Sequence, residues 1–273
     1  MMAAPLETRR ARIEARDAAL YALGIGMGRD PMDARDLRYV CGEDGAVFPT
    51  ASTVLADGSM EVLEQLAVPV ADVLHRAEYL TVHAPLRIGA DLLLDSRLAG
   101  MGDAPSGRGS LIDVETIVRD AASGSLLATL RRSMYLRGRV GLGTATVEPS
   151  VPLPELGERA AAQTLPGQAL LFRLNGDLNP LHSDPQAARE QGFERPILHG
   201  LCTYGMVAEA LLRARGIAPD ALREFTMRFT APVYPGEALD IAFGEDERGL
   251  HFTVHVADRQ VKVADRGLLV VRP

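Results

Sequence analysis

The chain has 273 residues, of which 47% are hydrophobic and 24% are charged. This length suits one large domain or two of about 130 residues. The formal net charge of −7 argues against a nucleic-acid-binding protein, because such proteins usually carry a basic face. An anionic ligand stays open, since a helix N-terminus or a local basic rim can bind one in an acidic protein. The two cysteines, Cys41 and Cys202, provide no disulfide framework and are typical of a reducing compartment.

The N-terminal stretch 8–28 combines basic residues with a short apolar run, which superficially resembles a signal peptide. Acidic Glu14 and Asp17 lie beside that run, and no small-residue cleavage site follows it, so we expect a helix and a loop instead. The glycine-rich segment 24–28 indicates a turn and not a phosphate loop, because no strand–helix–strand pattern surrounds it. The C-terminal "VVRP" is not a peroxisomal address, and no run of about 18 apolar residues predicts a membrane span. We therefore expect a cytoplasmic protein.

An internal duplication is visible in the sequence. Segments 77–96 and 223–243 each contain an Ala-Pro pair with a glycine four residues after the proline, and Pro85 and Pro232 are 147 residues apart. Alternating apolar residues precede and follow this motif in both places. The Gly- and Pro-rich stretch 137–157 is typical of an extended connector. The sequence therefore predicts an N-terminal unit at 1–136, this connector, and a C-terminal unit at 158–273.

Each unit shows a loop with a short helix, then a longer helix, then several strands. In the second unit the helix begins near Gly200 and should end before Gly216. Period-2 alternation predicts strands at 225–231, 237–243, 250–257 and 260–272. Consecutive strands joined by tight turns indicate an antiparallel sheet. A long helix wrapped by such a sheet, twice over, belongs to the α+β class.

The segment "FRLNGDLNPLHSDPQAARE", residues 172–190, places groups that can transfer protons in a constrained loop. Pro180 disfavours a helical conformation at Asn179, so Asp177, Asn179 and His182 precede the next helix. A turn-forming aspartate or a hydrogen-bonded histidine would explain any one of them alone. Three such residues in one rigid loop indicate a site.

A second feature lies nearby in the sequence. The apolar stretch "RPILHGLC" leads to His199 and Gly200 at the start of the predicted long helix. The first N–H groups of a helix lack internal acceptors and carry the positive end of its dipole. Gly200 lets a ligand oxygen approach the backbone. Close packing alone could also require a glycine at this position. Asp184 and Pro185 are explained as the N-cap and the first residue of a short helix.

The uninterrupted stretch from Phe172 to Ala187, followed by "PILHGL", resembles the signature of (R)-specific enoyl-CoA hydratases of the MaoC-like, hydratase 2 type. The first half, with "HAPLRIGADL" and "SGSLLATLRRSMYLRG", is similar to the degenerate N-terminal half of the two-unit members, such as the hydratase region of peroxisomal multifunctional enzymes. The resemblance covers nearly the whole chain. It implies a double hot dog, with two long helices each wrapped by an antiparallel sheet.

The resemblance also implies the chemistry: reversible hydration of trans-2-enoyl-CoA to (R)-3-hydroxyacyl-CoA. Asp177 and His182 would be the catalytic pair, Asn179 the polar residue that orders them, and Gly200 a donor to the thioester oxygen. No cofactor is expected, because CoA is part of the substrate. The corresponding loop of the first unit lacks the aspartate and the histidine, so one active site per chain follows. The first unit would then hold the acyl chain.

Two other functions stay open at this point. A hot-dog thioesterase would hydrolyse acyl-CoA, but such enzymes commonly use a lone carboxylate and lack the Asn-Pro-Leu-His segment. A non-catalytic acyl-CoA-binding subunit would have had no reason to keep that loop intact. We expect a homodimer that binds neither nucleic acid nor membrane, with a 3-hydroxyacyl-CoA dehydrogenase as a partner in the same pathway. No metal is expected either, since His251 and His255 share a strand face without a third ligand.

Overall fold

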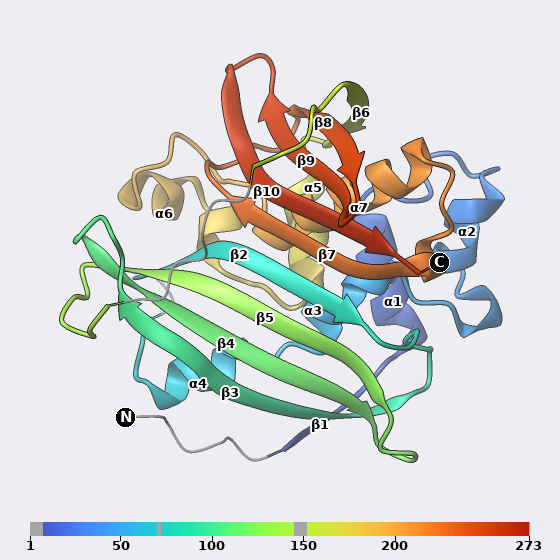
Figure 1. Cartoon of the computed structure of the whole chain (residues 1–273), viewed down its shortest axis with the longest axis horizontal. Coiled ribbons are helices and arrows are strands. Elements are labelled where there is room, and N and C mark those ends of the chain that lie inside the picture. Colours follow the sequence, from blue (N-terminus) through green and yellow to red (C-terminus); the bar gives the residue numbers. More distant parts are fainter. Residues whose placement is uncertain (1–7, 70–71, 145–151, 273) are drawn as a thin grey trace.

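The computed structural model describes residues 8–69, 72–144 and 152–272. Within these ranges one sheet of ten strands has the order β1-β3-β4-β5-β2-β7-β10-β9-β8-β6, and neighbouring strands run antiparallel (Figure 1). The strands are β1 (Arg9–Arg12), β2 (Val73–Val82), β3 (Asp91–Asp103), β4 (Gly109–Asp120), β5 (Leu126–Arg137), β6 (Glu158–Gln163), β7 (Leu222–Phe229), β8 (Ala238–Asp246), β9 (Gly249–Val256) and β10 (Val261–Val271).

The helices gather on one side of this curved sheet (Figure 1). The α-helices are α1 (Ala15–Gly24), α2 (Ala34–Val40), α3 (Ser52–Leu55), α4 (Ser59–Gln65), α5 (Gln168–Phe172), α6 (Pro185–Glu190) and α7 (Gly200–Ala214). Short 3-10 helices are η1 (Glu43–Gly45), η2 (Pro49–Ala51), η4 (Arg173–Asn175), η5 (Pro180–His182) and η6 (Pro219–Ala221). None of the helices in the described ranges combines the length and the apolar character needed to cross a bilayer.

The two halves of the sheet repeat one topology. The order β1-β3-β4-β5-β2 of the first half matches β6-β8-β9-β10-β7 of the second, and the halves join where β2 pairs with β7. At this seam Tyr79 lies opposite Thr226, and the two residues are 147 apart in the sequence, as Pro85 and Pro232 are. The duplication in the sequence is therefore a structural duplication about a local two-fold axis.

The repeated Ala-Pro segments occupy the same place in both halves, between β2 and β3 and between β7 and β8. Gly89 and Gly236 both have positive φ, 86° and 97°, a conformation that glycine adopts without a Cβ clash. The Gly89 N–H donates to the Ile13 carbonyl and the Gly236 N–H donates to Thr164 Oγ1. Each loop is thus closed on the residue that follows the first strand of its own half.

The second half contains the long buried helix that the sequence predicts. Helix α7 runs from Gly200 to Ala214, and Gly216 follows it with a φ of 62°. Helix α1 packs closely against it, because a Cβ on Gly205 would lie only 2.5 Å from both Tyr21 Oη and Ile25 Cγ2. The main apolar core of the protein surrounds this contact.

The first half differs from the prediction of a second long helix. Two short helices, α3 and α4, lie where one helix was expected, and the helical conformation is interrupted between them at Asp57 and Gly58. A Cβ on Gly58 would lie 2.0 Å from Ser96 Oγ, so only glycine lets the chain pass this close to β3. The Asp57 carboxylate accepts hydrogen bonds from the N–H and the hydroxyl of Ser59, the first residue of α4. Of the predicted connector 137–157, residues 145–151 lie outside the described residues.

Candidate active site

The loop between α5 and α6 is fixed by local hydrogen bonds. Gly176 has a φ of 110°, which turns the chain sharply ahead of Asp177. Asn179 Oδ1 accepts a hydrogen bond from the Leu181 N–H at 3.0 Å and caps the turn η5. Asp184 accepts hydrogen bonds from two N–H groups in the first turn of α6, as the sequence predicts. The loop therefore has little freedom to move Asp177 and His182 apart.

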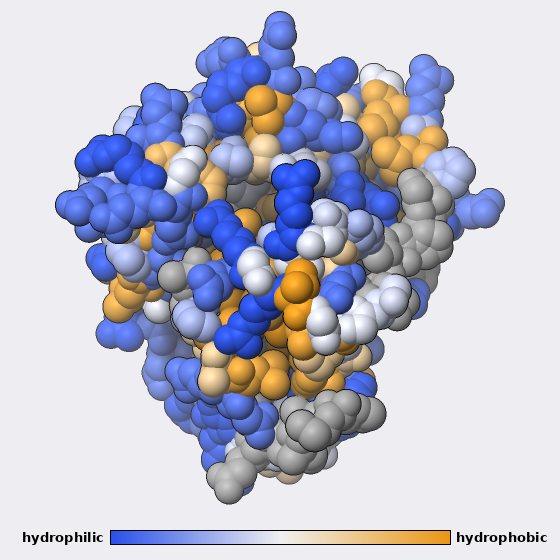
Figure 2. Space-filling model, turned by 90° about the vertical axis from the view of Figure 1, so that its left-hand side faces the viewer, coloured by the Kyte–Doolittle hydropathy of each residue, from blue (hydrophilic) through white to orange (hydrophobic). Residues whose placement is uncertain are grey.

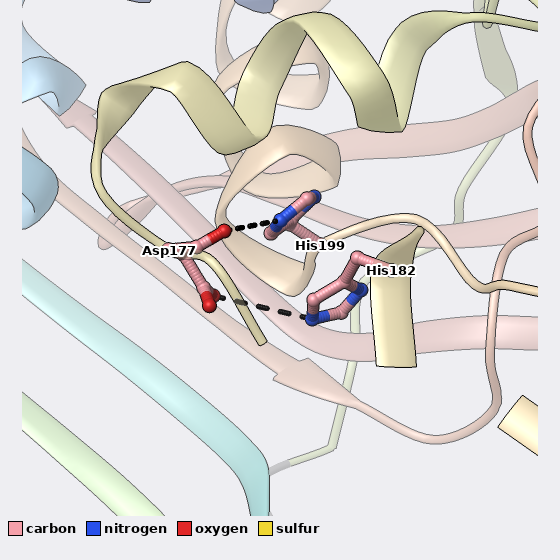
Figure 3. Close-up of side chains that lie close together, drawn as sticks. All are labelled: Asp177, His182 and His199. Atoms are coloured by element: carbon pink, nitrogen blue, oxygen red, sulfur yellow. Dashed lines mark hydrogen bonds and ion pairs between the residues drawn. The ribbon is translucent and has the colours of Figure 1, made fainter. Parts of the chain in front are cut away.

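Asp177 and His182 face each other across a short gap (Figure 3). His182 Nδ1 lies 2.8 Å from the Ile197 carbonyl oxygen, which can only accept, so Nδ1 carries the hydrogen. The neutral ring then presents the Nε2 lone pair, 3.9 Å from Asp177 Oδ2. This separation is too long for a direct hydrogen bond, but a water oxygen about 2.8 Å from both atoms would bridge them.

His199, the residue before α7, lies against this pair (Figure 3). Its ring stacks on that of His182, with centroids 3.7 Å apart and planes inclined by 23°. Its Nε2 lies 3.3 Å from the backbone carbonyl oxygen of Asp177, to which it donates. His199 therefore contacts both residues of the pair. In the sequence, the only signal of this position is that His199 directly precedes Gly200.

Burial determines the protonation of both rings. The pKa of His182 is lowered from its usual 6.5, chiefly because burial disfavours the charged ring, and the Asp177 carboxylate opposes this effect only in part. Burial and repulsion from the His182 ring lower the pKa of His199 to about 3. Both rings are accordingly neutral near pH 7, so His182 can accept a proton.

Helix α7 begins beside these side chains. Gly200 and the three loop residues Asp177, Asn179 and His182 line one cavity. The N–H groups in the first turn of a helix find no acceptor within it. A Cβ on Gly200 would lie 3.2 Å from Phe229 Cζ, so a larger residue would crowd this end of the helix. The structure therefore brings together all four residues that the sequence singled out.

The cavity has a volume of about 1130 Å³ and lies between the two halves of the protein. The second half contributes the loop and the start of α7, and the first half contributes residues of α3, α4, β2 and β5. Apolar side chains gather between hydrophilic ones on the face shown in Figure 2. Leu174 and Leu178 line the cavity and are 54% and 60% exposed, which gives its mouth an apolar edge.

The corresponding place in the first half is filled. The helical run of the first half begins with η2, where the Tyr21 hydroxyl donates a hydrogen bond to Thr50 Oγ1 at 2.8 Å. Both side chains are fully buried. The described part of the first half thus offers no space for a substrate at this position.

Asp177, His182 and His199 form the group of possible metal ligands within the described residues, with ligand atoms inside 4.8 Å of one another. The stacking of the two rings opposes a shared ion. A nitrogen ligand binds a metal in the plane of its ring at about 2.0–2.1 Å, and two stacked, nearly parallel planes do not meet at that distance. His251 is buried, and its Nε2 lies 2.9 Å from Asp246 Oδ1.

Comparison with known proteins links both halves to one group of enzymes. The sequence model described as "MaoC like domain" matches residues 150–266, and the one described as "MFE-2 hydratase 2 N-terminal domain" matches residues 12–138. The enoyl-CoA hydratase ChsH3 of Mycobacterium tuberculosis is 38% identical over 267 residues, covering 93% of this chain and 91% of that protein. The peroxisomal enoyl-CoA hydratase 2 of Arabidopsis thaliana is 36% identical over 264 residues, covering 88% of this chain and 84% of that protein.

Solved structures agree on the fold. A MaoC-like dehydratase from Phytophthora capsici superposes with a TM-score of 0.82 at 26% identity, covering 97% of this chain and 94% of that one. A Mycobacterium tuberculosis protein described as a double hot dog has a TM-score of 0.56 at 18% identity, covering 96% of this chain and 91% of that one, and supports the fold alone. The predicted α+β double hot dog is confirmed.

The neutral state of His199 predicts a pH-dependent stability. Below pH 6.5 the unfolded chain protonates His199, whereas the folded chain does so only near pH 3, so the free energy of unfolding decreases as the pH falls. Between pH 7 and pH 5 the wild type should lose about 2 kcal/mol more than the variant His199→Gln. Urea unfolding at both pH values measures this difference. His255→Gln is the control for the substitution itself, and equal losses in wild type and His199→Gln would contradict the buried neutral ring.

Proposed function

The chain belongs to the MaoC-like dehydratase and hydratase 2 family, which acts on acyl thioesters, and from this premise we propose that it reversibly hydrates trans-2-enoyl-CoA to (R)-3-hydroxyacyl-CoA. The observation that carries the proposal is the 3.9 Å gap between Asp177 Oδ2 and His182 Nε2, in a cavity that Gly200 also lines. The (R) configuration is proposed from the family, and the setting is fatty-acid or related acyl-CoA metabolism.

The pair can perform both proton transfers of the reaction. A water between Asp177 and His182 donates to both, and its oxygen forms the new bond to Cβ of the substrate. One proton of this water passes to the pair and one proton passes from the pair to Cα, so the pair ends as it began and one water is consumed. Each positioned proton transfer accelerates such a reaction about 10²–10⁴-fold.

The start of α7 can stabilise the charge that develops on the substrate. Attack at Cβ moves electron density to the thioester oxygen and produces an enolate-like intermediate. An N–H at Gly200 would donate to this oxygen, and the positive end of the helix dipole adds to the attraction. Because the helix fixes this donor before the substrate binds, little reorganisation is needed during the reaction.

Incubation with crotonyl-CoA tests the proposal against its two alternatives. We expect the absorbance of the enoyl thioester to decrease without release of free thiol, because water adds to the double bond and the thioester survives. Release of free CoA would instead identify a thioesterase. Binding without any chemical change would identify an acyl-CoA-binding subunit. Either of these results would contradict the hydratase proposal.

Replacement of Asp177 tests the catalytic pair. Asp177→Asn keeps the size of the side chain and an oxygen for the Asn179 N–H, but an amide does not accept a proton from water. We expect kcat for crotonyl-CoA to fall about 10²–10⁴-fold with the fold unchanged. Asp184→Asn makes the same change at the N-cap of α6, where asparagine caps equally well, and should leave kcat near the wild-type value. If Asp177→Asn retained more than about a tenth of the wild-type kcat, Asp177 would have no part in the mechanism.

His182→Ala should likewise abolish hydration while acyl-CoA still binds.

The wider organisation is proposed on the same basis. We propose that residues 1–136 form a unit that holds the acyl chain and that residues 158–273 form the catalytic unit. Residues 137–157 would be the linker between the two units. A homodimer is proposed from the family resemblance. The chemistry of the product suggests a 3-hydroxyacyl-CoA dehydrogenase as the enzyme that acts next. The free cysteines Cys41 and Cys202 support the reducing cytoplasm as the compartment.

A further inference from the structure

We propose that a buried ion cluster of Asp57, Glu78 and Arg132 keeps the first-half arm of the cavity open, and so makes the enzyme selective for long or bulky enoyl-CoA. The first-half arm is the part of the cavity lined by residues within 53–63, 73–76 and 132–135. The proposal rests on the proposed hydratase function and adds to it the residues that set the size of the acyl group.

Arg132 has acceptors for all five of its N–H groups. Nε donates to Glu78 Oε2 at 2.8 Å, and Nη1 donates to the Asp57 carboxylate and to Ser59 Oγ. Nη2 donates to the Thr53 carbonyl oxygen at 2.9 Å and to Glu78 Oε1 at 3.4 Å. A guanidinium with every donor in use offers none to a ligand, so Arg132 acts here by fixing its neighbours.

Those neighbours lie on different elements. Glu78 belongs to β2 and Arg132 to β5, whereas Thr53 belongs to α3 and Ser59 begins α4. The planar fork of Arg132 therefore fixes the distance of both short helices from the sheet, on either side of the break at Asp57. Apolar contacts are not directional and would let α3 and α4 settle closer to the strands.

The second half shows what the same position looks like without charges. Glu78 and Arg132 are paired across β2 and β5, and Phe225 and Leu269 are paired across β7 and β10. Glu78 and Phe225 are 147 residues apart, so the local two-fold axis relates the two pairs. The apolar pair packs into the closed core beneath α7. The charged pair borders the open cavity.

The burial of this cluster is itself informative. Glu78 is 0% exposed and the Arg132 side chain is 11% exposed. Desolvation of two such charges can exceed the energy of their attraction, and an apolar pair of similar volume is often at least as stable. Stability alone therefore does not explain why charges stand here, whereas a fixed spacing of the cavity wall does.

The cluster separates two apolar regions whose side chains line the arm. Leu63 and Met134 belong to a small core under α4, and Val54 and Leu55 pack against the main core. Both regions therefore border the arm. Loss of the cluster would allow them to approach each other and narrow the space.

The cluster also lies beside the path from the reacting groups into the arm. His75 Nε2 is 2.9 Å from Glu78 Oε2, and the His75 ring packs on Phe229 with centroids 4.7 Å apart. Phe229 in turn covers Gly200. A short acyl group would end near Gly200, and a longer one would pass His75 and enter the arm.

The test compares crotonyl-CoA with trans-2-dodecenoyl-CoA in the variant Asp57→Asn/Glu78→Leu/Arg132→Met. This variant removes every charge of the cluster with little change in side-chain volume, so it leaves no unpaired buried charge. We expect kcat/KM for the dodecenoyl substrate to fall roughly tenfold or more, and kcat/KM for crotonyl-CoA to stay within about threefold of the wild type. Because the folded fraction cancels in the ratio of the two values, partial loss of folding does not imitate this result.

Two further variants complete the design. Arg228→Met/Asp265→Leu removes a bidentate pair on the opposite face of the sheet and should leave the substrate ratio unchanged. If the triple variant does not fold, Arg132→Lys keeps the charge but loses the fork, and the same ratio should shift in the same direction.

A parallel fall for both substrates, or a dodecenoyl value that stays or rises, would overturn the role of the cluster. A wild type that hydrates neither substrate would contradict the proposed function instead.

Discussion

The pairing of β2 with β7 is the constraint on which the rest of this structure depends. It joins two five-stranded halves into one antiparallel sheet and places the helices of both halves on the same side. Because of this pairing, the loop and the start of α7 from the second half face α3, α4, β2 and β5 of the first. The cavity is lined by residues of both halves.

Within that frame the two halves have diverged in complementary ways. The second half keeps a long helix whose N-terminus meets the loop of Asp177 and His182, and its interior is closed and apolar. In the first half two short helices replace the long helix, with a break at Asp57 and Gly58. The charged pair Glu78 and Arg132 occupies the position that the apolar pair Phe225 and Leu269 has in the second half. Asp177 and His182 thus come from one copy of the unit, and the cavity beside them is lined by residues of both copies.

Much of this could be predicted from the sequence, because the signals are local. Alternation and turn residues indicate the strands, the 147-residue spacing indicates the duplication, and the loop around Asp177 and His182 has a distinctive order of residues. The rest depends on contacts between distant residues. His199 acquires its importance from stacking on His182, 17 positions away in the chain. Position 58, between α3 and α4, requires glycine because Ser96 on β3 leaves no room for a Cβ. Neither contact has a periodic or local signature.

In the proposed reaction, Asp177 and His182 act on one face of the substrate through one water. Hydration of crotonyl-CoA in D2O tests this proposal most directly. The deuteroxyl group at Cβ and the deuterium at Cα must then add to the same face of the double bond. Proton NMR of the 2-deuterio-3-hydroxybutyryl product distinguishes the two diastereomers by their vicinal coupling. We expect the syn-addition product alone. The anti product, or a mixture of both, would contradict the account.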